Sequence, residues 1–351
     1  MTSYGLTIFS DGVGPERFRR AAETACAAED AGFETVWTSE LYNRSATISM
    51  ASLAIATTRC RIGSSIAYGV GRTPVVWVAE ARDLDGLSGG RLVLGIGNGN
   101  ARMMEDWHGV SGEAPARRME ELVVLLRKLW RLDQGPVHHE GRFYRAHLSP
   151  TADTSPPLSE HLPLYIAGIN PRMVEVAGRV ADGLIGHPMF TARYVEEVIR
   201  PALAAGGETS GRAPESIGLV GILMCAVNDD LEQARRQMAF SIAQYAASRI
   251  YDRLFELHGW SEQQAQIRAA ARAHDTEALI AAVPDEAIDL IGVACRPGEL
   301  GDAVARHAAD YDHLNLTGCA WGLDAEAQAR AQLDIIDGMR ASLVAPSGAS
   351  G

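Results

Sequence analysis

Small polar side chains follow most of the apolar runs in this sequence, and few of them carry a charge. Hydroxyl and amide groups of this kind bind and orient a ligand more readily than they break a bond by themselves. The residues at these run ends are Ser10, Asp11, Ser39, Glu40, Tyr42, Ser65, Tyr68, Asn98, Asn100, Gly168, Asn170, His187, Asn228 and Thr317.

The sequence lacks the usual sets of catalytic residues. It has no Ser/His/Asp order with a nucleophile elbow, no HExxH, no lysine at a run end for a Schiff base and no acidic pair spaced as in glycosidases. No Cys or His spacing indicates a metal site. We therefore expect a cofactor to supply the reactive atoms and the protein to hold it.

Glycines at 95, 97 and 99 end the apolar run that starts at Arg91. A dinucleotide motif would need a further glycine where Asn100 stands, so a nicotinamide site is disfavoured. The glycines either close a strand or allow a flat ring to come close. A second candidate is 167–171, where a strand end runs into a helix that begins with Pro171. Free N–H groups there could hold a phosphate.

Short apolar strands alternate with amphipathic helices along the whole chain. The near-continuous apolar character of the strands predicts a parallel sheet covered on both faces. Eight such units favour a (β/α)8 TIM barrel, an α/β fold, with a pair of Rossmann-type domains as the alternative. The expected strands are 4–9, 34–39, 60–67, 91–97, 163–168, 183–187, 217–227 and 313–318, and the expected helices are 15–31, 44–57, 74–88, 115–132, 171–181, 191–205, 230–250, 297–310 and 324–343.

Two segments interrupt the alternation inside a predicted single domain over 1–344. Residues 133–161 read as a hairpin with a loop, and residues 251–296 as a helical insertion. Either insertion could form a wall of a substrate pocket or a contact between subunits. The tail 345–351 is expected to be disordered.

Composition limits the partners. The net charge of −12 disfavours nucleic acid and anionic membranes, so a small-molecule substrate is expected. No leader and no membrane span is visible, which predicts a cytoplasmic protein. The five scattered cysteines are expected to be reduced core residues.

Four stretches together resemble the bacterial-luciferase-like superfamily. They are 36–44 (VWTSELYNR), 59–100, 163–168 (PLYIAG) and 177–185 (AGRVADGLI), of which 59–100 is the most specific. Within the superfamily they are most similar to coenzyme F420-dependent oxidoreductases such as methylenetetrahydromethanopterin reductase. The resemblance implies a (β/α)8 barrel with insertions, usually a homodimer, and hydride transfer at the deazaflavin C5.

The resemblance also implies where the cofactor lies. A non-proline cis peptide would follow the third strand at Ser65-Ile66, behind the middle ring. The implied cofactor contacts, from the ring to the phosphate and ribityl chain, are Ser39, Ser64, Ser65, Ile66, Ala67, Asn100, Met103, Ala167, Gly168, Ile169, Met173, Gly186 and His187.

One departure from the family concerns the proton. Many relatives carry Asp-His after the second strand, whereas this chain has Ser39-Glu40. Glu40 is therefore expected to serve as the general acid, with Tyr68 and His187 as alternatives. Glu40 could instead be a structural acceptor. Sugar phosphates are disfavoured as substrates, because Asn100 replaces an acid of the sugar-phosphate-oxidising relatives and no lysine stands at their phosphate site.

Two other functions remain open on the same fold. One is a two-component monooxygenase that uses reduced FMN and oxygen. The other is a flavin-binding barrel without catalysis. A lyase without a cofactor is disfavoured by the missing lysine and metal ligands.

Overall fold

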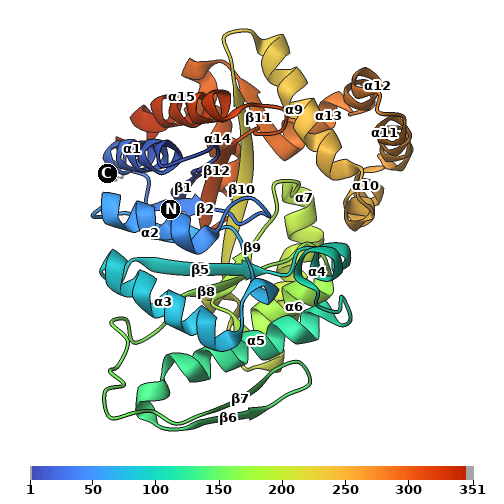
Figure 1. Cartoon of the computed structure of the whole chain (residues 1–351). Helices are drawn as coiled ribbons and strands as arrows, with labels where there is room; N and C mark the ends of the chain where they lie inside the picture. Colours follow the sequence, from blue (N-terminus) through green and yellow to red (C-terminus); the bar gives the residue numbers. More distant parts are fainter. Residues whose placement is uncertain (1, 345–351) are drawn as a thin grey trace, which may run out of the picture. The chain divides into compact units, whose positions relative to one another are not determined.

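The computed structural model describes residues 2–344, and the predicted disordered tail 345–351 lies outside them. The strands and helices form a (β/α)8 barrel with insertions, as the sequence predicts (Figure 1). Strand β5 (Leu92–Gly97) and strand β12 (His313–Gly318) are buried along their whole length. This burial explains why β5 is an almost continuous apolar run. Strand β12 also buries three polar residues, His313, Asn315 and Thr317.

Contacts group the described residues into two compact units, and each is considered by itself. The first unit is built from parts of 1–35, 186–199 and 220–351, and the second from 36–185 and 200–219. The predicted single domain over 1–344 stays a prediction.

The first unit contains four parallel strands in the order β11-β10-β12-β1. Helix α15 packs against α1, α14 and β12 (Figure 1). The elements of this unit are β1 (Ser3–Thr7), α1 (Glu16–Ala31), α7 (Ala192–Tyr194), a π-helical turn (Val195–Ile199), most of β10 (Gly218–Val227), α9 (Leu231–Ala246), α10 (Asp252–His258), α11 (Ser261–Ala273), α12 (Thr276–Ala281), α13 (Asp285–Ile291), β11 (Gly292–Cys295), α14 (Leu300–Ala308), β12 and α15 (Ala325–Val344).

The second unit contains the parallel strands β2-β3-β5-β8-β9, with the short strand β4 paired to β5. Helices α3 and α5 pack side by side along it (Figure 1). The remaining elements are most of β2 (Thr35–Thr38), α2 (Ala46–Ala56), β3 (Arg61–Ser64), β4 (Ala67–Tyr68), α3 (Pro74–Ser88), α4 (Ala101–His108), α5 (Pro115–Trp130), β6 (Val137–Glu140), β7 (Arg145–Leu148), β8 (Leu164–Ala167), α6 (Pro171–Val180), β9 (Gly183–Ile185) and α8 (Arg200–Thr209).

Four predicted boundaries are wrong. The third strand breaks after Ser64 and resumes at Ala67. Helix α4 forms where no helix was predicted, and the single helix expected over 191–205 is divided into three helical segments. The end of the helical insertion is a strand, β11, which pairs in parallel with β10. Its four small apolar residues resemble the end of a helix as much as a strand.

The predicted hairpin in 133–161 is present as the antiparallel pair β6-β7. Its connection is held to helix α5 by one carboxylate, Glu121. Glu121 accepts hydrogen bonds from the N–H groups of Arg142, Phe143 and Tyr144, and its Oε1 lies 3.2 Å from Nε2 of His139. Burial alone would raise the pKa of Glu121, but the hydrogen bonds from Tyr144, His139 and Phe143 lower it overall.

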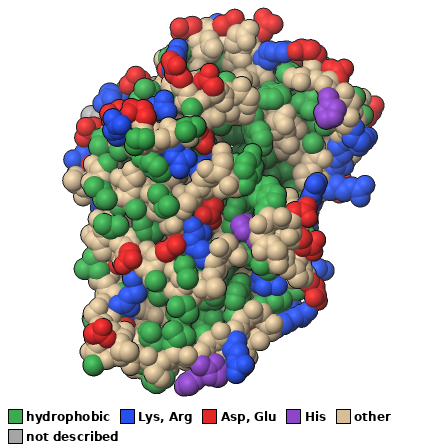
Figure 2. All heavy atoms as spheres, viewed as in Figure 1, with side chains coloured by type: hydrophobic (Ala, Val, Ile, Leu, Met, Phe, Trp, Pro, Cys, Tyr) green, Lys and Arg blue, Asp and Glu red, His purple; other side chains and the backbone are tan. Residues whose placement is uncertain are grey.

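The surface mixes acidic and basic side chains, and the face in Figure 2 has no continuous basic area. No helix within the described residues is long and apolar enough to cross a membrane. Cys60, Cys225, Cys295 and Cys319 are buried and Cys26 is half-buried, and none of the five forms a disulfide.

Candidate functional site

The peptide bond between Ser65 and Ile66 is cis, which confirms the prediction. These two residues are half-buried, whereas Ser64 and Ala67 on either side are buried. The chain therefore presents a small accessible step between β3 and β4. We call residues 65–68 the shelf.

The end of strand β2 holds the shelf from the side. The N–H of Ser65 donates a hydrogen bond to the carbonyl of Thr38 (2.7 Å), and the N–H of Glu40 donates one to the carbonyl of Ile66 (2.9 Å). The backbone on both sides of the Ser65-Ile66 bond is thus tied to one neighbouring strand end.

Strand β5 flanks the shelf with glycines. A Cβ atom at Gly97 would lie 2.7 Å from Cδ1 of Ile66 and 3.2 Å from Cβ of Ala167. At Gly95 it would lie 2.0 Å from the carbonyl oxygen of Ser64. These contacts are with residues of neighbouring strands and the shelf, so they favour the alternative that the glycines at 95 and 97 allow the strands to pack closely, and they give no support to a nicotinamide motif.

The hydroxyl of Ser64, one of the implied cofactor contacts, faces strand β5. The residue is fully buried, its Oγ donates to the carbonyl of Gly95 (2.7 Å) and it accepts from the N–H of the same residue (3.0 Å). The side chain joins β3 to β5, so this hydroxyl is not available to a cofactor.

Ser65 has the opposite arrangement. Its Oγ is buried and has no hydrogen-bond partner among the described residues, and the same holds for Oγ1 of Thr38. Buried hydroxyl groups normally find a partner. An unpartnered hydroxyl on the shelf suits the heteroatoms of a deazaflavin or flavin ring, so the residues present fit such a group.

Glu40 is bound on both carboxylate oxygens. Arg72 donates to Oε2 from Nη1 (3.0 Å) and to Oε1 from Nη2 (2.8 Å), and the N–H of Tyr68 donates to Oε2 (2.8 Å). This geometry favours the structural-acceptor alternative over the predicted general acid. Nothing local in the sequence marked Arg72, because the pair forms only when the second and third strands are adjacent.

Tyr68, whose N–H binds this carboxylate, is 6% exposed. Burial, and secondly the charge of Glu40, raises the pKa of Tyr68 to about 12. A phenol with this pKa keeps its proton at neutral pH. The raised pKa makes this phenol a weaker acid, and the role of Tyr68 in proton transfer stays a prediction.

Asn100 and Met103 belong to helix α4. The Oδ1 of Asn100 accepts from the N–H of Met103 (2.9 Å), so Asn100 is the N-cap of the helix. Met103 is half-buried. The amide NH₂ group of Asn100, which donates, is the part that this cap leaves for the predicted contact with a cofactor ring, together with the second lone pair of Oδ1. Ser39 is similarly engaged, because its hydroxyl accepts from Nη2 of Arg44 (3.2 Å).

The turn 167–171 joins β8 to α6 and has accessible backbone. Ala167, Gly168 and Ile169 are half-buried, and Asn170 makes no side-chain cap to the helix. A Cβ at Gly168 would lie 3.1 Å from Cγ of Met173, so the turn packs closely on the first turn of α6. Asn170 gives α6 no side-chain cap, but Pro171 has no N–H and the N–H of Met173 donates to the carbonyl of Asn170 (3.1 Å). Few N–H groups therefore remain there for the phosphate contacts, which stay a prediction.

Gly186 and His187 belong to the first unit. The N–H of Gly186 donates to the carbonyl of Val220 (2.8 Å). The Nδ1 of His187 accepts from the N–H of Met189 (3.2 Å), and its Nε2 lies 3.0 Å from the hydroxyl of Tyr251. Burial lowers the pKa of His187 to about 3. The imidazole is therefore neutral at pH 7 and is no general acid there. Tyr251, inside the helical insertion, was not predicted.

The lowered pKa of His187 predicts an acid-sensitive fold. The unfolded chain binds a proton at this imidazole below about pH 6.5, whereas the folded chain does so only near pH 3. Acidification from pH 7 to 5 should therefore cost about 2 kcal/mol of unfolding free energy through this group. Urea unfolding at both pH values should show a smaller loss in His187→Gln. The exposed His138→Gln variant should behave as the wild type, and an equal loss in His187→Gln would contradict the assignment.

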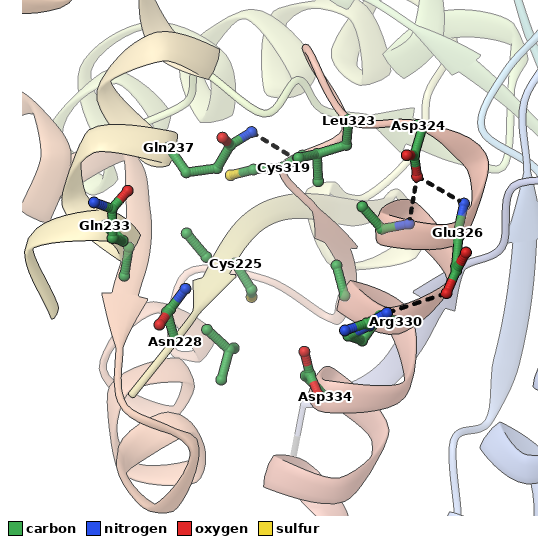
Figure 3. A pocket seen from close by; sticks show the side chains of 15 residues that line it. Cys225, Asn228, Gln233, Gln237, Cys319, Leu323, Asp324, Glu326, Arg330 and Asp334 are labelled. Carbon is green, nitrogen blue, oxygen red and sulfur yellow. Dashed lines mark hydrogen bonds and ion pairs between the residues drawn. The ribbon is translucent and has the colours of Figure 1, made fainter. Parts of the chain in front are cut away.

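A pocket of about 450 Å³ lies in the first unit, where the end of β10 meets α9 and the start of α15 (Figure 3). The loops after the last two strands often hold phosphate in (β/α)8 barrels. Here Asp324 already accepts from the N–H groups of Glu326 (3.0 Å) and Ala327 (2.8 Å). The carboxylates of Glu326 and Asp334 also line the space, and Arg330, which lines it too, is paired with Glu326 at 3.2 Å. This pocket disfavours an anion.

Within the described residues, no group of three or more His, Cys, Asp or Glu side chains could hold a metal ion. The second unit thus offers a shelf, a glycine-containing strand and an uncapped helix start. Together these can hold a flat ring and a phosphate, and they supply no strong acid or base.

Comparison with known proteins places the chain among related sequences and folds. A 5,10-methylenetetrahydromethanopterin reductase from Methanopyrus kandleri is 24% identical over 319 residues, which cover 86% of this chain and 88% of the reductase. An uncharacterized protein of Mycobacterium tuberculosis is 32% identical over 293 residues, 81% of this chain and 85% of that protein.

The fold is also found in solved structures. The coenzyme F420 dependent tetrahydromethanopterin reductase from Methanopyrus kandleri superposes with a TM-score of 0.78 at 22% identity, covering 97% of this chain and 98% of that one. The family model described as luciferase-like monooxygenase matches residues 4–313. The chain belongs to the luciferase-like monooxygenase family.

Proposed function

We propose that the protein is an oxidoreductase that uses coenzyme F420 to transfer a hydride to or from a small organic substrate. The observation that carries this proposal is the shelf, an accessible segment beside the glycines of β5 that presents the unpartnered hydroxyl of Ser65. Bound there, the deazaflavin would supply a C5 atom that gives or accepts the hydride. Relatives named as reductases support the same proposal.

Residues of the second unit would hold the cofactor. Ser65, Ile66 and Ala67 would contact the ring from the shelf, and the N-terminal N–H groups of α6 would bind the phosphate. Ala167, Gly168, Ile169 and Met173 would line that end. The contacts of Gly186 and His187, in the first unit, stay predictions.

The protein would contribute position more than acid–base chemistry. Glu40 is engaged by Arg72, Tyr68 has a pKa of about 12 and His187 has a pKa of about 3. None of the three is matched to proton transfer at neutral pH. Holding the hydride donor and acceptor in contact would therefore be the main source of rate.

Titration of the purified chain with coenzyme F420 and, separately, with FMN tests the proposal. We expect F420 fluorescence to change with a saturable binding curve, and FMN to bind more weakly. The Gly86→Ala variant, altered on the exposed side of α3, should bind as the wild type. Tight binding of FMN without binding of F420 would contradict the proposal.

An FMN-dependent two-component monooxygenase is the second candidate, because the matching family model carries that description. The shelf would support a flavin ring in the same way. Oxygen uptake by the protein with reduced FMN, above the rate of free reduced FMN, would favour it.

We also propose a homodimer through helices α2 and α3. Their outer surface exposes Ile48 (60%) and Ile55 (72%), seven residues apart and hence on one face of α2, with Val75 and Val76 on α3. Large aliphatic side chains exposed together mark protein contacts. A second copy of the chain would bury them.

The dimer predicts a monomeric variant. Ile55→Glu should place a charge in the interface and shift the protein to the mass of one chain in size-exclusion chromatography with light scattering. Val13→Glu, at a position 97% exposed outside these helices, should stay dimeric. A wild-type protein with the mass of one chain would refute the interface.

A further inference from the structure

The shelf and the residue after it are attached at three points, two of which are made by Glu40 and one by Trp77. Besides the backbone contact with Ile66, the carboxylate of Glu40 accepts the N–H of Tyr68 at 2.8 Å. One residue further, the carbonyl of Gly69 accepts from the indole N–H of Trp77 at 2.9 Å. Residues 66, 68 and 69 are thus each tied to a fixed group.

Arg72 fixes the carboxylate that makes the middle attachment. Its guanidinium binds both oxygens of Glu40, and its side chain is 13% exposed against 10% for Glu40. A buried bidentate pair has one geometry, because its two parallel hydrogen bonds fix both distance and orientation.

Arg72 is itself held on every side. Its Nε lies 2.6 Å from Oε2 of Glu80, and its Nη2 donates to Ser45 and Thr47. The guanidinium also lies over the ring of Trp77, with 4.6 Å between Cζ and the ring centroid. The arginine therefore connects α2 and α3 to the shelf.

We infer that Glu40 and Arg72 are positioning residues that set the shelf in its binding geometry before the cofactor arrives. The inference rests on the proposed function for the identity of the cofactor. It assigns the pair no contact with the ring and no proton transfer. A preset site binds more tightly, because ordering the segment costs no free energy at the moment of binding.

Two measurements on the full chain test this. Hydrogen–deuterium exchange without cofactor should be about tenfold faster at the amides of 66–70 in Arg72→Met, since losing the guanidinium frees the carboxylate from the N–H of Tyr68. If only about a tenth of the molecules then hold the shelf in place, the Kd for coenzyme F420 should rise about tenfold.

Variants with graded changes sharpen the test. Arg72→Lys keeps the positive charge but loses the two parallel N–H donors of the guanidinium. It should therefore recover part of the slow exchange and part of the affinity for F420. Glu40→Gln combined with Arg72→Met should be no worse than the more severe single variant, because the two residues act as one unit. Arg127→Met, which removes a similar ion pair with Asp182 (3.1 Å), should change neither the exchange of 66–70 nor the Kd.

The outcomes separate the two proposals. Unchanged exchange at 66–70 in Arg72→Met would overturn the positioning role, whatever the protein binds. Faster exchange with an unchanged Kd for F420 would also overturn it. A pair with a purely structural role would change the local stability of the segment without changing the binding of the cofactor. A wild type that binds no F420 would refute the proposed function, while faster exchange in Arg72→Met would still support the positioning role.

Discussion

Gly95→Ala is expected to destabilise the protein by about 3 kcal/mol or more, near the upper end for an overpacked core. Its Cβ would lie 2.0 Å from the carbonyl oxygen of Ser64 and 2.3 Å from Cδ1 of Ile185. The first contact is with backbone, which cannot turn away. The shift of the urea unfolding midpoint, with the slope unchanged, measures the effect.

Gly97→Ala is the matched control on the same strand. Its Cβ would meet Cδ1 of Ile66 at 2.7 Å, the end of a flexible side chain. We expect the fold to survive with a loss of about 1 kcal/mol, while the displaced Ile66 weakens binding of F420 about tenfold. Equal destabilisation at both positions would contradict this reading of the strand.

Gly206→Ala should have a comparably large effect on helix packing. Its Cβ would lie 2.0 Å from the carbonyl oxygen of Glu175, and a Cβ at Gly178 would lie 2.2 Å from that of Leu203. Each of the helices α6 and α8 thus has a glycine that packs directly against the backbone of the other helix. We expect a loss of about 3 kcal/mol or more in the free energy of unfolding, measured by urea titration.

Gly86→Ala provides the control for the glycine series. Nothing lies within 4 Å of a Cβ there, and the residue stands inside helix α3. Alanine should stabilise this helix by up to about 1 kcal/mol, since glycine loses more backbone freedom on folding. If Gly206→Ala were as stable as this variant, the close approach of α6 and α8 would be wrong.

The barrel was predictable because its strands are buried on both faces and therefore read as apolar runs. The break in the third strand was not visible in that pattern. Ser65 and Ile66 continue the run, and only the resemblance to the luciferase-like superfamily predicted a cis peptide there. The same resemblance placed both Ser64 and Ser65 among the ring contacts. A sequence does not show which serine of a pair faces inward.

Helix α4 illustrates a different failure. Its signals were present, with Asn100 as N-cap and Gly109 in the left-handed conformation after its end. The glycines at 95, 97 and 99 that precede it are also typical of a dinucleotide-binding loop, which does not predict this helix. Arg72 left no local signal at all, since its partner Glu40 lies on another strand end and the contact exists only in three dimensions.

The carboxylate of Glu121, which fastens the connection of the β6-β7 hairpin to α5, bears on how the chain can be re-engineered. Because Glu121 holds three consecutive amides of the connection at 142–144, the segment 133–161 can be exchanged as a block if its replacement offers N–H groups at that point. A graft without them would leave a buried charge unpaired. Libraries that vary this hairpin should therefore keep Glu121 together with the connection, or remove both.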